Sequence, residues 1–589
     1  MRYLTWLLAA CLAAPAWSDP VSLKKLEGTW ARYDVTGMPG ALPAITSVRL
    51  SFPQRDRAGQ GEAIWFQLEA YGGESRLFAL AMLVGAPDFL YPGGLAVPVT
   101  RYVLFPAQGP PLEYVEQGTG LALLPHLGFF STLLPHGTEV ADPDLPLFAR
   151  GVYLGRSLRR VDRGGKAELL PVAQARRLVL DTDVLVGTSR AVRDISGRRV
   201  LPATPNPTGD EPDYQYRDLT QDDYAAMVQA GFNLFPVPLA HLPWVIDQPV
   251  HFVLREGFEQ LPDLLYRSNF LGSVVFMDEP ACRAMTDDVV TQADLPQDAA
   301  TVVMELTRGR YEGAGGDGQR NLDLLLRQAG YDLGAPVLQP DYPVWETVAS
   351  AAWYEQQAGV AGWCFEGRYQ PEWFAGLVRQ QVGVDFPTEP ALCVRFHHAF
   401  FTGAARRFGG EWGEAIYGQM DSLAACLAFP LAYQQGARYF WLWTSDRTHH
   451  VPFNEQLEHA RALRQYQSEH PRQSRRQLIA AARVAVALPW GYLCDHYAMK
   501  TYESYFAVFP GEHPGGRMWW SASMELGDLN REGVPYREVL AAAMRQAVAL
   551  LREGTPFDFV FLAPGEKLAG YDRLYRVLET GKVEQERAR

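Results

Sequence analysis

The chain has few cysteines, and their spacing excludes the two structural roles that cysteines most often play. Six cysteines occur among 589 residues, and no two of them form a Cys-Xaa-Xaa-Cys pair. One of them, Cys11, lies in an apolar N-terminal segment, and the others are Cys282, Cys364, Cys393, Cys426 and Cys494. An odd, scattered set indicates neither a disulfide framework nor a zinc site. We expect most of the five to be small buried apolar residues.

Signals of several other chemistries are missing as well. The segment 478–589 contains no Gly-Xaa-Gly-Xaa-Xaa-Gly and no phosphate-loop pattern. Ser521 and Ser523 lack the flanking glycines of a hydrolase nucleophile elbow. The histidine doublets at 397–398 and 449–450 do not suit a metal, because adjacent side chains point apart. We therefore predict no metal site and no cofactor.

An excess of positive charge is also absent. Lys and Arg total 54 against 67 Asp and Glu, which leaves a net charge of −13 at pH 7. A diffuse negative balance argues against nucleic acid or an anionic membrane as the main partner. After the N-terminal segment, no apolar run approaches the ~18 residues of a transmembrane helix, so no integral membrane segment is predicted. None of these features indicates the oligomeric state.

The N-terminus, MRYLTWLLAACLAAPAWSDP, has the form of a secretory signal peptide. A basic residue precedes an apolar run, and small residues follow it. Cleavage after Ser18 defines a signal peptide of residues 1–18, and cleavage after Ala16 also fits. The run Leu8–Cys11 resembles a lipoprotein cleavage box, but this alternative leaves a very short apolar region. The sequence thus predicts a secreted or periplasmic protein.

The pattern of apolar and polar residues changes twice along the rest of the chain, which predicts three domains and an α/β fold class. Residues 19–180 alternate short apolar runs with turn residues, a pattern typical of a β-sandwich-like domain. From 181 to 470, apolar strands alternate with helical stretches such as DLTQDDYAAMVQAG, a capped helix that ends at Gly231. At least six strand–helix units in one run favour a (β/α)8 TIM barrel. Residues 478–589 predict a small α/β domain.

The stretch GSVVFMDEP, from Gly272 to Pro280, carries the strongest chemical signal. A buried strand ends in two adjacent carboxylates, Asp278 and Glu279. Like charges this close repel, and one of the two tends to keep its proton near neutrality. The pair could cap the next helix or bind arginines. It could equally belong to a site at the carboxyl end of the strand.

Other predicted strands of the barrel also end in polar or aromatic residues. Barrel enzymes carry their reactive groups at the carboxyl ends of strands. Paired carboxylates supply the acid and the nucleophile or base of a glycosidase, and aromatic faces stack on sugar rings. Packing inside a barrel is the alternative explanation for each tryptophan. The candidate catalytic residues are Glu279, Asp278 and Glu366, and the candidate substrate-binding residues are Trp363, Arg255, Tyr417, Gln419, Trp441, Trp443 and Asp446.

These segments together suggest a family. The runs GFNLFPVP, VVFMDEP, WYEQQAGVAGWCFEGRY, WGEAIYGQMD and YFWLWTSDRTHHVPFNEQL resemble the large clan of (β/α)8 glycoside hydrolases that includes the β-galactosidases. The C-terminal part is similar to the glutamine-amidotransferase-like module behind some of those barrels. The resemblance covers roughly residues 180–570, and its motifs are loose. It implies an acid/base glutamate after strand four, which is Glu279, although Asp278 stands where the clan usually has Asn. It also implies a nucleophile at the end of strand seven, where this chain has Gln419, while Glu366 ends strand six.

Two other functions fit the same residues. The Asp278–Glu279 doublet resembles that of hexosaminidases in which the 2-acetamido group of the substrate attacks the anomeric carbon. That resemblance implies that Glu279 is the acid and that Asp278 orients the acetamide. A barrel that only binds or scaffolds glycans is the third hypothesis. In either catalytic scheme the partner is a carbohydrate, and we expect Glu279 and Glu366 to point into one cleft.

Overall fold

The computed structural model describes most of the chain between residues 28 and 587. The described residues are 28–36, 45–58, 61–84, 99–117, 157–195, 216–254, 263–264, 267–273, 279–281, 295–311, 343–444, 450–472, 474–492 and 527–587. Asp278, Arg255 and Asp446, the proposed signal peptide and the alternative lipid anchor Cys11 all lie outside them.

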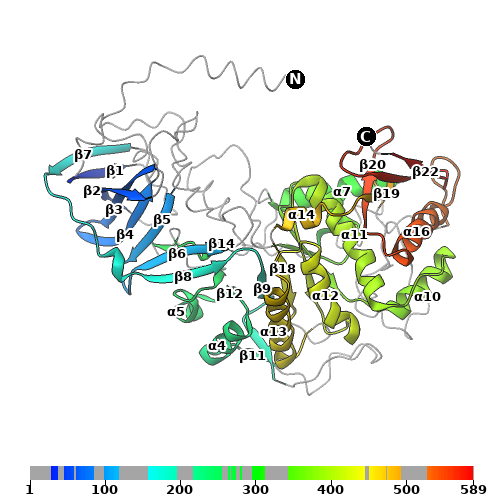
Figure 1. Ribbon diagram of the computed structural model, residues 1–589, viewed down its shortest axis with the longest axis horizontal. Helices are drawn as coiled ribbons and strands as arrows, with labels where there is room; N and C mark the ends of the chain where they lie inside the picture. The colour runs from blue at the N-terminus through cyan, green and yellow to red at the C-terminus, as the bar shows by residue number, and fades with distance from the viewer. Residues whose placement is uncertain are drawn as a thin grey trace, which may run out of the picture.

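The N-terminal strands form a single sheet of eight strands in the order β7-β1-β2-β3-β4-β5-β6-β8 (Figure 1). All neighbours are antiparallel except β6 and β8, which are parallel. The strands are β1 Thr29–Thr36, β2 Ser47–Ala58, β3 Gly61–Gly72, β4 Ser75–Val84, β5 Val99–Pro106, β6 Leu112–Gln117, β7 Ser157–Gly164 and β8 Arg176–Asp181.

The expected sandwich-like arrangement of this region is not found among the described residues. Alternation along the strands gives the sheet two apolar faces, one of which carries Trp65, Ala79 and Val103. A second sheet would normally cover such a face. Here the segment 169–175, which includes the short 3-10 helix η3 Val172–Gln174, packs against it instead. Alternating apolar residues therefore predicted the strands but could not specify what covers them.

The middle of the chain forms a second sheet of eight strands, and every pairing in it is parallel. Its order is β14-β13-β12-β9-β18-β17-β16-β15. Successive strands of this sheet are neighbours except β14 and β15, and the last strand, β18, pairs with the first, β9, so the sheet curls. Its edges are β14 and β15. The strands are β9 Leu185–Thr188, β12 Leu234–Val237, β13 His251–Leu254, β14 Phe270–Ser273, β15 Val344–Glu346, β16 Gly362–Gly367, β17 Glu411–Ile416 and β18 Tyr439–Leu442.

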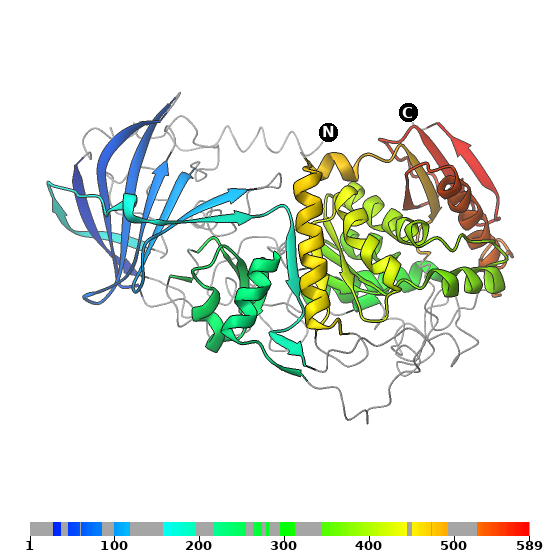
Figure 2. The same cartoon turned by 60° about the horizontal axis from the view of Figure 1, so that its bottom comes forward.

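Helices cover the outer side of this curled sheet (Figure 2). They are α4 Gln221–Ala230, α5 Leu242–Val245, α7 Pro296–Tyr311, α9 Ala351–Gln357, α10 Pro371–Val382, α11 Pro390–Phe408, α12 Ser422–Gln434, α13 Phe453–Glu469 and α14 Arg475–Ile479. The predicted capped helix is α4: Thr220 and Asp223 form a capping box, and Gly231 ends the helix in the left-handed conformation. The α/β class is thereby confirmed.

The inner side of the curled sheet is filled by one apolar cluster to which all eight strands contribute. Its members are Leu185, Leu234, Val253, Leu271, Trp345, Cys364, Ala415, Tyr417, Tyr439, Trp441 and Trp443. Successive side chains of a strand point to opposite faces. Membership in this cluster therefore shows which residues of each strand face inward, and it sets the positions of the site residues.

A small third sheet, in the order β20-β19-β21-β22, packs against the helices of the parallel sheet. It comprises β19 Val484–Pro489, β20 Phe557–Leu562, β21 Arg573–Val577 and β22 Val583–Glu586, with the helix α16 Tyr536–Arg552. The rings of Phe400 and Phe559 stack with centroids 4.2 Å apart. A Cβ at Gly403 would lie 2.0 Å from the carbonyl oxygen of Phe559, so glycine permits this close approach. The first and third sheets lie at opposite ends of the molecule in both views (Figures 1 and 2).

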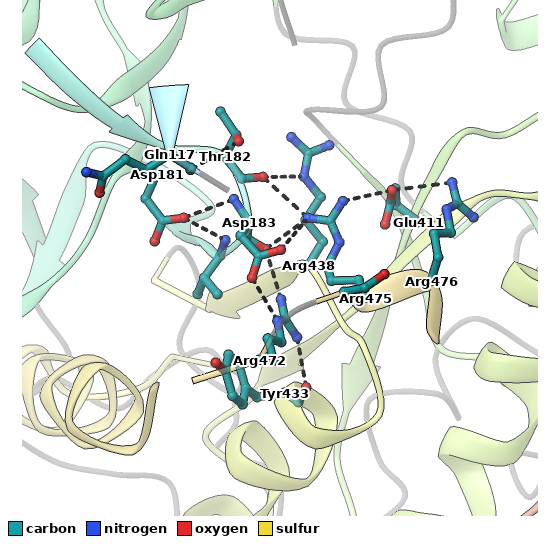
Figure 3. A network of polar contacts seen from close by, with 12 residues as sticks. Gln117, Asp181, Thr182, Asp183, Glu411, Tyr433, Arg438, Arg472, Arg475 and Arg476 are labelled. Atoms are coloured by element: carbon teal, nitrogen blue, oxygen red, sulfur yellow. Dashed lines mark hydrogen bonds and ion pairs between the residues drawn. The ribbon is translucent and has the colours of Figure 1, made fainter. Parts of the chain in front are cut away.

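A polar network fastens the N-terminal sheet to the amino ends of the parallel strands (Figure 3). Thr182, between β8 and β9, donates its backbone N–H to Gln117 of β6 at 2.8 Å. Next to it, Asp183 accepts hydrogen bonds from Arg472 and Arg475 at 2.8 and 3.3 Å. Arg475 also donates to Glu411, the first residue of β17, at 3.0 Å. The amino ends of the parallel strands therefore carry ion pairs that join structural elements.

Among the described helices, none combines the length and the apolar character that a membrane span requires.

Candidate active site

Glu366 and Tyr417 face the inner side of the curled sheet near the carboxyl ends of its strands. Glu366 lies in β16 two residues after Cys364, which faces inward, and only 2% of it is exposed. Tyr417 directly follows β17 and belongs to the inner cluster itself. A spacing of two residues keeps side chains on one face of a strand. The sixth and seventh strands therefore deliver a carboxylate and a phenol to the same end of the sheet.

Glu279 reaches this end from the opposite edge of the sheet. It follows β14, and its backbone N–H donates to the carbonyl oxygen of Trp345 in β15 at 2.8 Å. Its φ is +47°, and it is the only residue other than glycine with a positive φ in the described part of the chain. Such a conformation costs a residue with a Cβ roughly 1–2 kcal/mol. Strain of this kind persists where surrounding contacts hold it, and it is found often at functional sites.

One guanidinium lies between the two carboxylates. Arg368 donates from Nη2 to Oε2 of Glu366 at 2.7 Å, and the same nitrogen lies 3.9 Å from Oε1 of Glu279. These two distances limit the separation of the two oxygens to less than about 7 Å. That range includes the ~5–5.5 Å of retaining glycosidases and only the lower edge of the ~6.5–9.5 Å of inverting ones. The structure thus brings together the two glutamates that the sequence analysis paired.

Tyr417 contacts Arg368 and so lies beside the two glutamates. The Arg368 guanidinium lies over its ring, 4.3 Å from the centroid. Burial raises the pKa of the Tyr417 phenol well above its usual value, and the charge of Glu366 raises it further, while Arg368 opposes the shift. The phenol therefore stays protonated and can donate a hydrogen bond. Trp443 stacks on Tyr417 with ring centroids 4.9 Å apart.

The other aromatic candidates occupy two different layers. Trp441 packs inside the sheet, with its ring centroid 4.9 Å from that of Trp345, and a Cβ at Gly187 would meet its ring at 2.4 Å. Trp363 points the other way. Its indole N–H donates to Glu355 of α9 at 2.7 Å, and its ring contacts Phe401 of α11.

The structure therefore does not bring Trp363 to the site. Its position in β16 differs from that of Glu366 by three residues, an odd spacing that places the two side chains on opposite faces. Gln419 lies beyond β17 and is buried, and its backbone oxygen accepts a hydrogen bond from the side chain of Gln370. Asp278, Arg255 and Asp446 cannot be placed, because they lie outside the described residues.

The sequence analysis missed Glu346, the last residue of β15. It is fully buried, and its Oε2 accepts the backbone N–H of Ala281 at 2.7 Å. Burial raises the pKa of Glu346 well above its usual value, and the charges of Glu355 and Glu279 raise it further. In the sequence, Glu346 directly follows the apolar residues Val344 and Trp345, which could have marked the end of a strand. A strand of only three residues is too short to be predicted from its apolar pattern.

A carboxylate does occur in strand seven, but it faces the helices. Glu414 is fully buried and accepts hydrogen bonds from Tyr369 at 2.7 Å and from His398 at 3.0 Å. Burial raises the pKa of Glu414 and lowers that of His398, so each group favours its neutral form. Inward-facing Ala415 is its neighbour in the strand, so Glu414 has the wrong orientation for a nucleophile at the carboxyl end.

Within the described residues, no group of three or more His, Cys, Asp or Glu side chains could hold a metal ion. Two of the described cysteines, Cys364 and Cys393, are buried and free, whereas Cys426 is exposed. Comparison with protein-family models gives no match, and comparison with curated proteins gives none either. Function is therefore inferred from the geometry of the site.

Proposed function

We propose that the protein is an exported glycoside hydrolase in which Glu279 is the acid/base and Glu366 the nucleophile. The observation that carries this proposal is the meeting of these two buried carboxylates at one guanidinium, Arg368. Glu279 follows the fourth strand of a curled parallel sheet, Glu366 lies in the sixth, and both gather at the carboxyl end of the sheet. Active sites of barrel enzymes lie at that end.

The proposal includes a closed (β/α)8 barrel. The order of the strands is that of such a barrel, with successive strands adjacent except β14 and β15, and with β18 beside β9. The edges β14 and β15 would form the closing seam. The hydrogen bond from Glu279 to Trp345 supports this closure, because it joins the chain beyond β14 to β15.

The proposed chemistry follows from the positions of the two glutamates. Glu279 would protonate the glycosidic oxygen as the bond breaks, and Glu366 would attack the anomeric carbon from the other face to give a glycosyl-enzyme. Water would then release the sugar, with Glu279 acting as the base. The hydrogen bond from Arg368 orients the Glu366 carboxylate and favours its charged form. The short separation of the carboxylates favours retention of configuration.

The substrate is proposed to be an extracellular or periplasmic glycan, reached after removal of residues 1–18 on export. Substrate-assisted hydrolysis of 2-acetamido sugars is a second candidate, since Asp278 directly precedes Glu279. The closeness of Glu366 favours an enzyme nucleophile over that alternative. A barrel that binds glycans without cleaving them is the third.

The test is turnover on a panel of nitrophenyl glycosides and native polysaccharides. For a substrate that the parent cleaves, Glu279→Gln should lower kcat by ~10²–10⁴-fold while binding is kept. Glu113→Gln is the matched control: Glu113 is also buried and paired with arginines, but in the N-terminal sheet. Wild-type turnover by Glu279→Gln would contradict the assignment. Binding without cleavage by the parent would favour the scaffold. Cleavage of 2-acetamido sugars alone, lost in Asp278→Asn, would favour the substrate-assisted route.

A further inference from the structure

The fully buried carboxylate of Glu346 lies where the two edges of the parallel sheet approach each other. Its Oε2 accepts the N–H of Ala281, two residues beyond Glu279. Its Oε1 accepts the N–H groups of Thr347 and Val348 at 2.8 and 3.0 Å. Both oxygens are thus engaged, one by the chain that follows β14 and one by the chain that follows β15.

Two hydrogen bonds tie the turn Glu279–Ala281 to β15. The N–H of Glu279 binds the carbonyl oxygen of Trp345, and the N–H of Ala281 binds the adjacent side chain, Glu346. Between them the backbone of Glu279 holds its φ of +47°. An unfavourable backbone conformation of this kind relaxes when its restraints are removed. Both bonds restrain this turn, and both come from β15.

A carboxylate is suited to this position in a way that an amide is not. Glutamine has the same shape but only one acceptor oxygen, and its NH2 group would face a backbone donor on the other side. Burying a carboxylate is costly, and the charges of Glu355 on α9 and of Glu279 add to that cost at Glu346. Three amide donors offset that cost in part.

We propose that Glu346 is a positioning residue: its carboxylate clamps the turn Glu279–Ala281 to β15 and so holds the Glu279 side chain beside Arg368 and Glu366. This inference rests on the proposed function for its catalytic consequence, whereas the clamp itself can be tested without any substrate. A displacement of about 1 Å in a catalytic group can lower the rate about 10²-fold.

The experiment compares Glu346→Leu, which has no acceptor, with Glu414→Leu in the full chain. Glu414 is the matched control because it is an equally buried glutamate whose carboxylate accepts hydrogen bonds from Tyr369 and His398 on the helix side of the sheet. We expect hydrogen exchange at Ala281 to accelerate roughly tenfold or more in Glu346→Leu alone. On a substrate that the parent cleaves, kcat should fall ~10²-fold with KM changed less than about threefold.

The outcomes separate the clamp from the proposed function. Unchanged exchange at Ala281 overturns the clamp, and faster exchange with parental kcat overturns the positioning role. If the parent cleaves no glycoside, the proposed function fails, while the exchange result still decides whether the clamp exists. Should Glu346→Leu fail to fold, Glu346→Gln is measured at Ala281, Thr347 and Val348. Parental exchange at Ala281 together with parental kcat would then reject the proposal.

Discussion

The buried glutamates around the parallel sheet are held by several kinds of partner. Glu346 binds backbone amides, Glu355 binds an indole N–H, and Glu414 binds a phenol and an imidazole. Two glutamates bind cations instead: Glu366 binds Arg368 near the carboxyl ends of the strands, and Glu411 binds Arg475 at their amino ends. Neutral partners satisfy hydrogen bonds but leave the acid free to protonate on burial, whereas a cation favours the carboxylate. Glu366 is therefore held at the carboxyl ends of the strands by a charge-assisted hydrogen bond from Arg368.

Removal of this cation is the first test at the scale of a residue. Arg368→Met should lower kcat/KM by ~10–10²-fold, because the charge-assisted hydrogen bond that orients Glu366 is lost. Arg368→Lys, which keeps the charge without the fork of donors, should lose less. Steady-state kinetics on a substrate of the parent measures both. Arg476→Met is the control, since Arg476 pairs with Glu411 at the opposite end of the sheet. Equal losses in Arg368→Met and Arg476→Met would indicate a general loss of stability instead.

At the scale of elements, the predictions succeeded where a strand contains several apolar or aromatic residues and failed where the direction of a side chain decided the outcome. The segments around β16, β17 and β18 were predicted as strands from their apolar and aromatic residues, and in the structure each has at least four consecutive buried residues. The three residues of β15 gave no comparable signal. Trp363 was assigned to the site because it lies near Glu366 in the chain. Strands buried on both faces do not show in their composition which residues point inward.

The prediction of the site rested on one rule. It too was limited because the sequence does not show which side chains of a strand point inward. The rule that reactive groups lie at the carboxyl ends of strands predicted that Glu279 and Glu366 lie close together, and both lie within 4 Å of Arg368. It could not find Arg368, because a single arginine after a strand is common. Nor could it exclude Glu414, whose place in strand seven looks suitable until the inward face of β17 is known.

The sequence predicted helix α4 together with its capping residues, and the contribution of one of them to stability can be tested. Asp223 completes the capping box and accepts hydrogen bonds from Arg217 and Arg193 at 2.6 and 2.7 Å. These arginines lie in the short strands β11 Tyr216–Asp218 and β10 Val192–Asp194. Asp223→Ala should lower the free energy of unfolding by roughly 2–3 kcal/mol near pH 7. The exposed neighbour Asp222 supplies the control variant Asp222→Ala, expected to change stability by less than about 0.5 kcal/mol.

The effect of Asp223 should also depend on pH. Burial opposes ionisation, but hydrogen bonds from Arg217 and Thr220 outweigh it and hold the pKa of Asp223 well below its usual value of 3.8. A carboxyl with a lowered pKa in the folded state stabilises the protein above its unfolded pKa and loses that contribution as the pH falls. The difference between Asp223→Ala and the parent should therefore shrink below about pH 4. Urea unfolding across this range measures it, and a difference that grows on acidification would contradict the assignment.

At the scale of the whole molecule, the parallel sheet is joined to its two neighbours by different chemistry. The N-terminal sheet is fastened through the arginines of Figure 3, at the end of the strands opposite Glu366. The C-terminal sheet rests on α11 through stacked phenylalanines and one buried acid, Asp558. Neither junction contributes a side chain to the contacts described for Glu279, Glu366 and Arg368. Changes at either should therefore alter stability before they alter catalysis.

Asp558 allows the contribution of the C-terminal junction to stability to be measured. It lies in β20 and accepts hydrogen bonds from Thr402 of α11 at 2.6 Å and from Tyr571 at 2.8 Å. Burial raises the pKa of Asp558 to about 6, although these hydrogen bonds and Arg406 oppose the shift. The folded protein therefore binds a proton more tightly than the unfolded chain does between about pH 4 and pH 6. The stabilisation is fully present below about pH 4 and is lost as the pH rises toward 6.

We expect Asp558→Asn to abolish this dependence. Relative to the variant, the parent should lose on the order of 3 kcal/mol of unfolding free energy between pH 4 and pH 7. Urea unfolding of both proteins at several pH values isolates the contribution of Asp558, because every other group titrates in both. Thr402→Val serves as the control, since it removes a hydrogen bond at the same junction without removing the titrating group. Parallel stability curves for parent and Asp558→Asn would show that Asp558 is ionised in the fold throughout this range, and that Arg406 outweighs its burial.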